Sequence, residues 1–492
     1  MSLWTPQIGL VLALLLPLVG AGAILALAKR PNLREGATLV TAALLLANVI
    51  PLVMMVGDGA RPSLSFGQIA PGLEIALSLE PLGALFAGTA SVLWILNSLF
   101  SIGYMRAHHD AHDETRFYAF FAFAIAATMG IALAGNMLTL FVFYEALTLS
   151  TYPLVAHHGD ENARRGARTY LLVLLSTSLA LLLPAIAITY FAAGSTDFLP
   201  GGLLAGAGAG EALIGLLLVL YAFGIGKAAL MPVHSWLPNA MVAPTPVSAL
   251  LHAVAVVKAG VFTMLKVVVY VFGPDAVAGH PVANVLAGIA AISIVLASLI
   301  ALSQPNMKAR LAWSTVSQLS YVTLGAMLAT PAALTGAAFQ IVMHAFAKIT
   351  LFMCAGAFTT ATHMTEVSDT RGFGRRMPLL FAAFLIAAVS ITGLPPLGGM
   401  WTKLFLSMGA AESGAVWALV ALIVSTLLNV AYLIAIPVRA FLTPATKDPA
   451  SYAAAPRLTV LPPALTALAT LVLFFLAGPI YDYISPVFGG AQ

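Results

Sequence analysis

Long apolar runs recur along the whole chain, and short polar stretches separate them. Each run is long enough, or nearly so, to cross a hydrocarbon core of about 30 Å at about 1.5 Å per helical residue. Fourteen such runs lie near residues 7–28, 37–56, 82–104, 117–134, 137–156, 170–193, 212–237, 246–271, 282–302, 311–330, 334–359, 378–408, 415–437 and 458–480. The pattern predicts an all-α polytopic membrane protein with about 14 transmembrane helices, and residues 57–80 and 194–211 are expected to be its larger loops on one side.

Two stretches interrupt this pattern with residues that break helices. Proline removes a backbone donor and clashes with the preceding turn, so the freed carbonyls need other partners or water. The breaking residues are Pro232, Pro238, Pro244 and Pro246 in the stretch 221–260, and Pro395, Pro396, Gly398 and Gly399 in the overlong run at 378–408. We therefore expect two discontinuous helices.

Composition and charge placement agree with a membrane protein. The 492 residues are 61% hydrophobic and 8% charged, whereas soluble proteins carry about 25% charged residues. Loops after even-numbered runs hold only Arg61, and five lysines lie within runs. The other 16 of the 22 basic residues lie in loops after odd-numbered runs: Lys29, Arg30, Arg34, Arg106, Arg116, Arg164, Arg165, Arg168, Lys308, Arg310, Arg371, Arg375, Arg376, Arg439, Lys447 and Arg457. The positive-inside rule then puts these loops in the cytoplasm and both termini outside.

The five lysines inside apolar runs are the candidate functional groups. A charged side chain at bilayer depth costs about 2.5–3.5 kcal/mol, so it is kept only where it faces protein or a water-filled path. Lys266 lies near the outer end of its helix, and we expect it to snorkel to the interface. The four others, which we predict to be buried, are Lys227, Lys258, Lys348 and Lys403.

Glu145 is the only acidic residue in the middle of a predicted helix. One carboxylate cannot permanently neutralise four lysines, so some of them must be neutral or only transiently protonated, as in a proton carrier. A Glu145–Lys227 pair roughly 8 Å apart, at an effective dielectric of about 20, interacts by about 2 kcal/mol. The alternative is that each lysine is fixed by a carboxylate or by carbonyl groups and serves packing alone.

Histidines extend the candidate path. His344 and Lys348 share a helix face at i and i+4, and His234 shares a face with Lys227 if their helix is regular. Imidazole both accepts and donates a proton near neutrality. We predict a proton relay that includes His234, His252, His344 and Lys348, with a hydrogen-bonded core histidine as the alternative for His252.

Several other chemistries find no support in the sequence. The single cysteine, Cys354, rules out an internal disulfide and a cysteine-ligated cluster. The histidines have no carboxylate or thiol partners for a metal, and no glycine-rich loop precedes Lys-Ser or Lys-Thr. We expect no cofactor, no metal and no nucleic-acid partner, so the energy source lies in other chains.

Four segments carry a resemblance to a known family. They are HSWLPNAMVAPTPVSALLHAVAVVKAGVF, KARLAWSTVSQLSY, HAFAKITLFMCAGA and GLPPLGGMWTKLF. In this order they resemble the antiporter-like subunits shared by respiratory complex I, membrane-bound hydrogenases and Mrp-type cation/proton antiporters. The resemblance extends from about residue 80 to 440.

The resemblance implies a fold and a set of site residues. The fold has two inverted five-helix repeats, each with a discontinuous helix, at 117–271 and 282–437, between N-terminal helices (1–116) and a C-terminal helix (458–492). The family's essential glutamate falls on Glu145, and its lysines fall on Lys227, Lys258 and Lys403. Its His-x-x-x-Lys signature falls on His344 and Lys348.

The branch of the family is indicated by Lys403, where related subunits carry glutamate, and by the loop AHHGDENARRGARTYLL. Both are similar to the D subunit of Mrp antiporters, whereas PTPVSALLHA is more typical of longer subunits. The chain ends soon after its last apolar run, so we expect no lateral helix. The resemblance implies a transporter rather than an enzyme: a multi-pass subunit in a prokaryotic plasma membrane that moves protons, with other subunits, against Na⁺ or K⁺. A proton-pumping subunit of complex I or a hydrogenase, and a membrane subunit of a CO₂-hydrating complex, remain alternatives.

Overall fold

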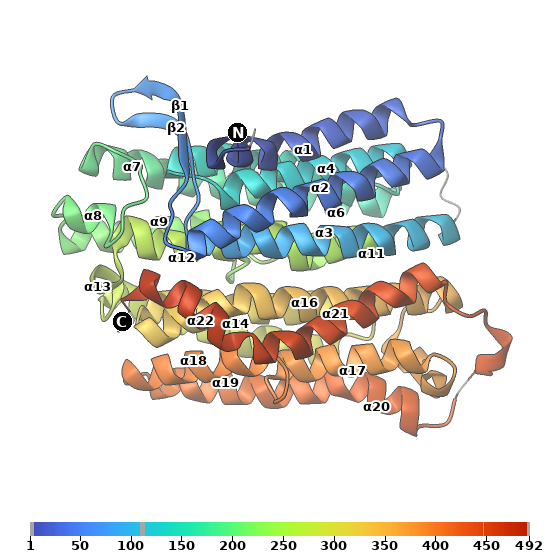
Figure 1. Ribbon diagram of the computed structural model, residues 1–492. Coiled ribbons are helices and arrows are strands. Elements are labelled where there is room, and N and C mark those ends of the chain that lie inside the picture. The colour runs from blue at the N-terminus through green and yellow to red at the C-terminus, as the bar shows by residue number, and fades with distance from the viewer. Residues whose placement is uncertain (1–3, 109–113, 446, 490–492) are drawn as a thin grey trace.

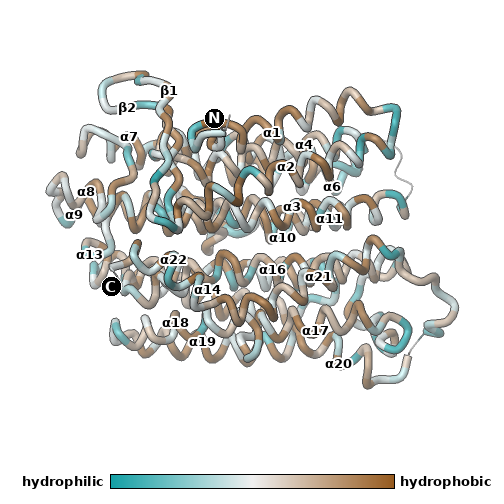
Figure 2. Tube along the Cα trace, in the orientation of Figure 1, coloured by the Kyte–Doolittle hydropathy of each residue, from teal (hydrophilic) through white to brown (hydrophobic). Residues whose placement is uncertain are grey.

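A computed structural model describes residues 4–108, 114–445 and 447–489, and within them the chain is almost entirely helical (Figure 1). Eleven of the described helices are long and apolar enough to span a membrane, and two shorter apolar helices are α9 Glu211–Gly224 and α17 Pro378–Thr392. Apolar residues dominate the middle of the helices, and polar residues gather toward their ends (Figure 2). The predicted all-α membrane architecture is confirmed.

The first half of the chain forms one side of the molecule, drawn in blue to green in Figure 1. Its α-helices are α1 Pro6–Ala26, α2 Pro31–Gly57, α3 Pro81–His108, α4 Glu114–Ala132, α5 Met137–Val155, α6 Glu161–Thr177, α7 Leu183–Ala193, α8 Leu203–Gly206, α9 Glu211–Gly224, α10 Trp236–Asn239, α11 Thr245–Ala249 and α12 Val256–Val267. Shorter 3₁₀ and π segments are η1 Ser178–Leu182, η2 Gly226–Ala228, η3 Ala240–Val242, η4 Leu250–Val254 and η5 Val268–Phe272.

The second half lies beside the first and is drawn in yellow to red (Figure 1). Its α-helices are α13 Pro274–Val277, α14 Pro281–Ser303, α15 Met307–Leu328, α16 Pro331–Thr362, α17 Pro378–Thr392, α18 Gly399–Glu412, α19 Val416–Asn429, α20 Ala435–Leu442, α21 Arg457–Phe475 and α22 Ala477–Ile484. Its shorter segments are η6 Val367–Thr370, η7 Phe373–Arg375, η8 Val430–Ile434, η9 Pro449–Ser451 and η10 Ser485–Phe488.

One element was not predicted. Residues 57–80, expected to be a loop, contain an antiparallel hairpin of β1 Ser63–Ala70 and β2 Leu73–Ser78. Gly72 makes the turn possible because it adopts a φ of 73°, which residues with a side chain rarely take. Isolated bridges join β2 to Ala134 and Asn136 to Asp197. We call the end of the molecule that holds this hairpin, residues 133–136 and residues 194–202 the hairpin face.

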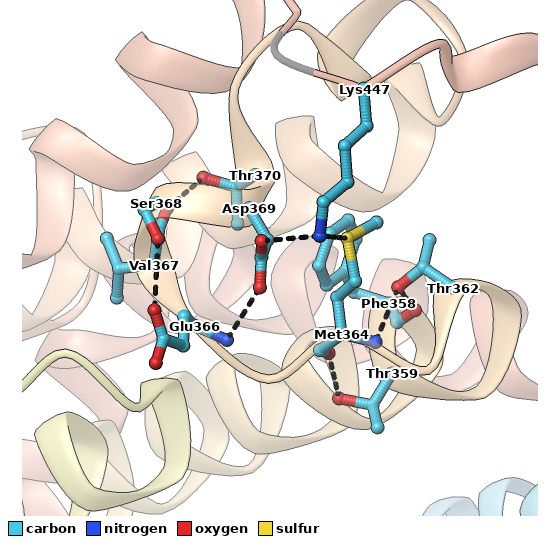
Figure 3. A network of polar contacts seen from close by, with 10 residues as sticks. All are labelled: Phe358, Thr359, Thr362, Met364, Glu366, Val367, Ser368, Asp369, Thr370 and Lys447. Atoms are coloured by element: carbon cyan, nitrogen blue, oxygen red, sulfur yellow. Dashed lines mark hydrogen bonds and ion pairs between the residues drawn. The ribbon is translucent and has the colours of Figure 1, made fainter.

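The opposite end carries the basic loops and is fastened by a polar cluster (Figure 3). Lys447, in the segment after α20, lies 3.1 Å from an Asp369 carboxylate oxygen and 3.2 Å from Met364 Sδ. The Asp369 carboxylate also accepts a hydrogen bond from the Glu366 backbone amide. The cluster thus ties the segment that follows α20 to the segment that follows α16.

Both predicted helix breaks are found. Helix α9 ends at Gly224 and regular α-helix resumes only at Trp236. Within this interruption Ala229 adopts a φ of 53°, and Pro232 has no backbone donor from which a helix could continue. The apolar run at 378–408 divides into α17 and α18 around Pro395 and Pro396.

Two spans form the centre of the bundle. The most apolar windows of residues 245–272 and of α16 are 100% buried, compared with 39% for α1 and α2. A helix enclosed on all sides can carry polar groups without exposing them to lipid. The central spans contain four of the candidate residues: His252, Lys258, His344 and Lys348.

We expect Gly260→Ala to destabilise the protein, because a Cβ at this position would lie 2.2 Å from the Lys227 carbonyl carbon. Overpacking of this kind costs about 1–3 kcal/mol or more. Gly288→Ala, in α14, is the matched control because nothing lies within 4 Å of its Cβ position. Thermal unfolding of the purified variants, followed by size-exclusion, should show a lower midpoint for Gly260→Ala only. Equal midpoints would contradict the close approach.

Candidate functional site

Lys227 sits in the first break, where η2 presents it to α5. Its side chain is fully buried, and Nζ donates to the Tyr144 carbonyl at 2.8 Å and to Thr148 Oγ1 at 2.6 Å. Nζ also lies 3.2 Å from the centroid of the Tyr144 ring, whose negative face attracts a cation. Neutral oxygen atoms and an aromatic ring, rather than a carboxylate, hold this lysine.

Glu145 is the neighbour of Tyr144 on α5. Both of its carboxylate oxygens are buried, and neither has a hydrogen-bond partner among the described residues. No ion pair within 4.0 Å joins Glu145 to Lys227 among those residues, although its charge lies within Coulombic range of the lysine. Val142 and Leu149, on the same helix, are exposed. The carboxylate therefore lies where the buried face of α5 borders the outer surface.

Lys258 links the two halves of the chain. From α12 its Nζ lies 2.8 Å from Nδ1 of His344 and 3.3 Å from the Gln340 carbonyl oxygen, both on α16. Lys258 and His344 are almost completely buried, and Nε2 of His344 has no partner among the described residues. A lysine and an imidazole in direct contact, each able to carry a proton, form the centre of the candidate site.

Lys348 lies one turn after His344 on α16, as predicted for an i, i+4 pair. Its Nζ donates to the Leu311 carbonyl at 3.2 Å and to the Ser314 hydroxyl, both on α15. His252 lies within η4, and its ring centroid is 4.8 Å from that of Phe352. Neither ring nitrogen of His252 has a partner among the described residues, so the hydrogen-bonded core histidine considered for this position is not seen.

Lys403 follows the second break, as the fifth residue of α18, and is half-buried rather than buried. Its Nζ donates to Thr426 Oγ1 at 2.6 Å and lies 5.5 Å from the centroid of Tyr321. Gly393 makes room for its side chain, since a Cβ there would lie 2.5 Å from Lys403 Cδ. A small cavity of about 10 Å³ is lined by both His344 and Lys403, and roughly 10–15 Å³ is the least that holds one water. The cavity is therefore at the lower limit of size for a single water.

One expectation from the sequence is wrong, and the condition attached to another is not met. The regular helix that would place His234 on the same face as Lys227 is absent, and His234 instead lies near the Pro232 carbonyl and 5.3 Å from the Trp313 ring. Lys266 does not snorkel: it is fully buried, and its Nζ lies 3.3 Å from Oε1 of Glu80. Glu80 immediately precedes α3 in the sequence, and only tertiary packing brings it to Lys266.

The lysines could be found from the sequence, but the groups that hold them could not. These groups are Tyr144, Thr148, Gln340, Ser314 and Thr426. A hydroxyl within an apolar helix ordinarily bonds to the carbonyl four residues earlier, and Thr148 and Thr426 do so as well. Nothing in the local sequence distinguishes them from other helix hydroxyls. Tyr144 and Thr148 could be suspected only because they lie beside Glu145.

A bundle of membrane-spanning helices with two breaks around a row of enclosed lysines defines a multi-pass membrane protein with a titratable core. The chain belongs to the NADH:quinone oxidoreductase/Mrp antiporter transmembrane family, whose match covers residues 134–429. The resemblance read from the four sequence segments is thereby confirmed.

Individual relatives include both branches of this family. The N subunit of the NADH-quinone oxidoreductase of Desulforudis audaxviator is 32% identical, over 76% of this chain and 74% of its own length. The D subunit of the Na⁺/H⁺ antiporter of Alkalihalophilus pseudofirmus is 26% identical, over 96% of this chain and 95% of its own. Other curated relatives are longer, and the chain spans 34% to 60% of their length. A solved structure of the Mrp complex from Dietzia sp. DQ12-45-1b has a TM-score of 0.83 at 23% identity, covering 98% of this chain and 97% of that one.

Proposed function

We propose that the chain is the proton-translocating subunit of a multisubunit monovalent cation (Na⁺ or K⁺)/proton antiporter. The observation that carries the proposal is the row of enclosed lysines, with Lys258 touching His344 where the two halves meet. Near full-length similarity to the D subunit of an antiporter supports this branch of the family. In this role the chain is a transporter rather than an enzyme and works with other subunits in a prokaryotic plasma membrane.

The proposed route runs from Glu145 and Lys227 through Lys258 and His344 to Lys403. Lys227 exchanges its neutral oxygen partners for Glu145 when it takes up a proton, because the unpartnered carboxylate is the only acid in the middle of a helix nearby. An unpaired buried polar group costs about 1–3 kcal/mol. Water molecules therefore bridge the proton-carrying groups of the route that do not touch each other. His252 and Lys348 lie beside the route and add proton-carrying capacity. His234 lies at the surface beside Trp313, so it takes part only where the proton route meets that surface.

The repeat organisation belongs to the same proposal. Residues 117–271 and 282–437 each supply one broken helix with one lysine, Lys227 or Lys403, and the remaining segments, 1–116 and 458–492, flank them. The face with the basic loops is the cytoplasmic one by the positive-inside rule. Both termini and the hairpin face then lie outside.

A second candidate is supported by the similarity to the N subunit of an NADH-quinone oxidoreductase, at 32% identity. The same lysine row would then be driven by electron transfer in other chains. The two functions differ in the driving force. A Na⁺ or K⁺ gradient drives proton movement in the first, and a reductant with a quinone drives it in the second.

The route is incomplete in the single chain, so we expect the chain alone to be inactive. Reconstituted alone in vesicles with an internal pH dye, it should show no exchange when a Na⁺ or K⁺ gradient is imposed, whereas the native complex should. The physical reason is that Glu145 lies beside exposed apolar residues and lacks a partner within the described chain. Exchange by the lone chain that Lys227→Ala abolishes would show that one subunit suffices.

Glu145→Ala and Lys227→Ala should each abolish cation-dependent proton movement in everted vesicles while the complex still assembles. The loss follows because each removes one member of the lysine–glutamate combination at which the proposed route begins. Glu161→Ala and Lys29→Ala, both at exposed positions, are the matched controls and should transport normally. If either site variant exchanges protons at the wild-type rate, the residue replaced in that variant is not part of the route.

Lys403→Glu should retain more transport than Lys403→Ala, because a carboxyl group at this position still takes up and releases a proton. Its side chain is shorter, so the hydrogen bond to Thr426 Oγ1 is weakened and the rate falls below that of the wild type. Rates measured from neutral to alkaline pH should rank wild type, Lys403→Glu and Lys403→Ala in descending order. Normal transport by Lys403→Ala over that range would exclude Lys403 from the route.

A further inference from the structure

A pocket opens in the hairpin face, away from the row of lysines described above. Its volume is about 280 Å³, and its lining includes Arg61, Glu80, Phe198, Lys266, Tyr270 and Val487. These residues come from five separate parts of the chain. Arg61 is the single basic residue in the loops after even-numbered apolar runs. Among the described residues, the charged side chains in the lining are Arg61, Glu80 and Lys266.

Lys266 is one of the residues that line this pocket. Its Nζ lies 3.3 Å from Oε1 of Glu80 and donates to the Ala134 carbonyl at 2.8 Å. The ring centroids of Phe198 and Phe262 lie 4.4 Å and 5.3 Å from Nζ. The side chain is fully buried, and it is one of the residues that line the pocket. Among the five lysines in the apolar runs, Lys266 is the one with a carboxylate partner in the described residues.

Glu80 is held by four donors. The backbone amides of Leu82 and Gly83 bond its two oxygens at 2.7 Å and 2.9 Å, and Tyr270 donates to Oε2 at 2.9 Å. Lys266 is the fourth. The amides at the start of a helix stabilise a carboxylate, which fixes Glu80 in place. Three of the four donors hold the Glu80 carboxylate in its orientation without Lys266, so the acid–base pair is preformed.

Helix α12 connects this pair with the row of lysines. Lys258, Phe262 and Lys266 follow each other at intervals of four residues and share one face of the helix. At the helical rise per residue, Lys266 lies about 12 Å from Lys258 along the axis. Phe262 stands between them and packs against Phe86 of α3, with ring centroids 5.0 Å apart. Phe262 is fully buried and does not line the pocket, and its ring centroid lies 5.3 Å from Lys266 Nζ.

We propose that Glu80, Lys266 and Tyr270 form a proton port on the hairpin face, with Phe262 as its inner seal. This inference rests on the proposed function and adds an exit in the first half of the chain. The Lys266 ammonium gives one proton to Glu80, which breaks an N–H bond, forms an O–H bond and leaves both groups neutral. Glu80 then releases that proton to pocket water, and the neutral amine takes the next proton from the side of Lys258.

The first test measures water access. In a Cys354→Ala background, Lys266→Cys should react with a membrane-impermeant trimethylammonium methanethiosulfonate added to the hairpin face of the intact complex, and not from the opposite face. Cys354 donates to the Leu380 carbonyl and takes no part in the route. Thr263→Cys, one turn earlier on α12 and buried away from the pocket, is the matched control and should remain unlabelled. No labelling of Lys266→Cys overturns the port.

The second test restores the charge. Lys266→Cys should lower proton exchange by about tenfold or more, as expected for loss of a proton-transfer group. Aminoethyl methanethiosulfonate, which attaches a new ammonium, should recover exchange, whereas the neutral propyl reagent should not. Equal recovery by both reagents, or no loss before modification, overturns the port. If the parent complex exchanges no protons under any cation gradient, the proposed function fails, and labelling alone then supports or overturns the port.

Discussion

The structure depends on keeping lysines inside a membrane protein without matching carboxylates. Each charge at bilayer depth costs a few kcal/mol unless the protein supplies a substitute for water. At Lys227, Lys348 and Lys403 the substitutes are carbonyl and hydroxyl oxygens or the face of a tyrosine ring, and at Lys258 they are a carbonyl and an imidazole. Such partners accept a hydrogen bond from an ammonium, but they do not commit the lysine to a permanent charge. This is the property that a transient proton carrier requires.

The fold follows from this constraint. The buried ammonium groups need oxygen partners in the middle of the bundle. Lys227 meets them from the irregular backbone of the first interrupted helix, and Lys403 from the regular helix that follows the second break. The central spans around Lys258 and His344 are wholly enclosed, while the outer helices carry apolar side chains toward lipid. Close helix contacts make this possible, since Gly260 lies directly against the backbone of Lys227. A larger side chain there would separate the broken stretch from α12.

The helices, both breaks and the lysines are predictable from the sequence, because each leaves a local signal: an apolar run, a proline, or a charge in an apolar run. The β1–β2 hairpin also has a local signal, the Pro71-Gly72 dipeptide between two short strand-like segments, but a search for long apolar runs passes over it. The first break was expected, but the path of its backbone, which places His234 away from Lys227, has no local signal. The error at Lys266 has a different cause. Glu80 belongs to a distant part of the chain, so the pair exists only after tertiary packing. Hydroxyl partners such as Thr148 are equally invisible, because most apolar helices contain similar residues.

The two glutamates show why position matters more than residue type. Glu80 is fixed by two backbone amides, a tyrosine hydroxyl and Lys266, so its oxygens already have partners. Glu145 has two buried oxygens with none among the described residues, and it stands at the edge of the bundle. Unsatisfied buried carboxylate oxygens are costly, so Glu145 must gain a partner, either by movement of Lys227 or from water or a neighbouring subunit. A carboxylate with a choice of partners can move from one group to another, whereas a coordinated one acts only on the lysine that it already contacts.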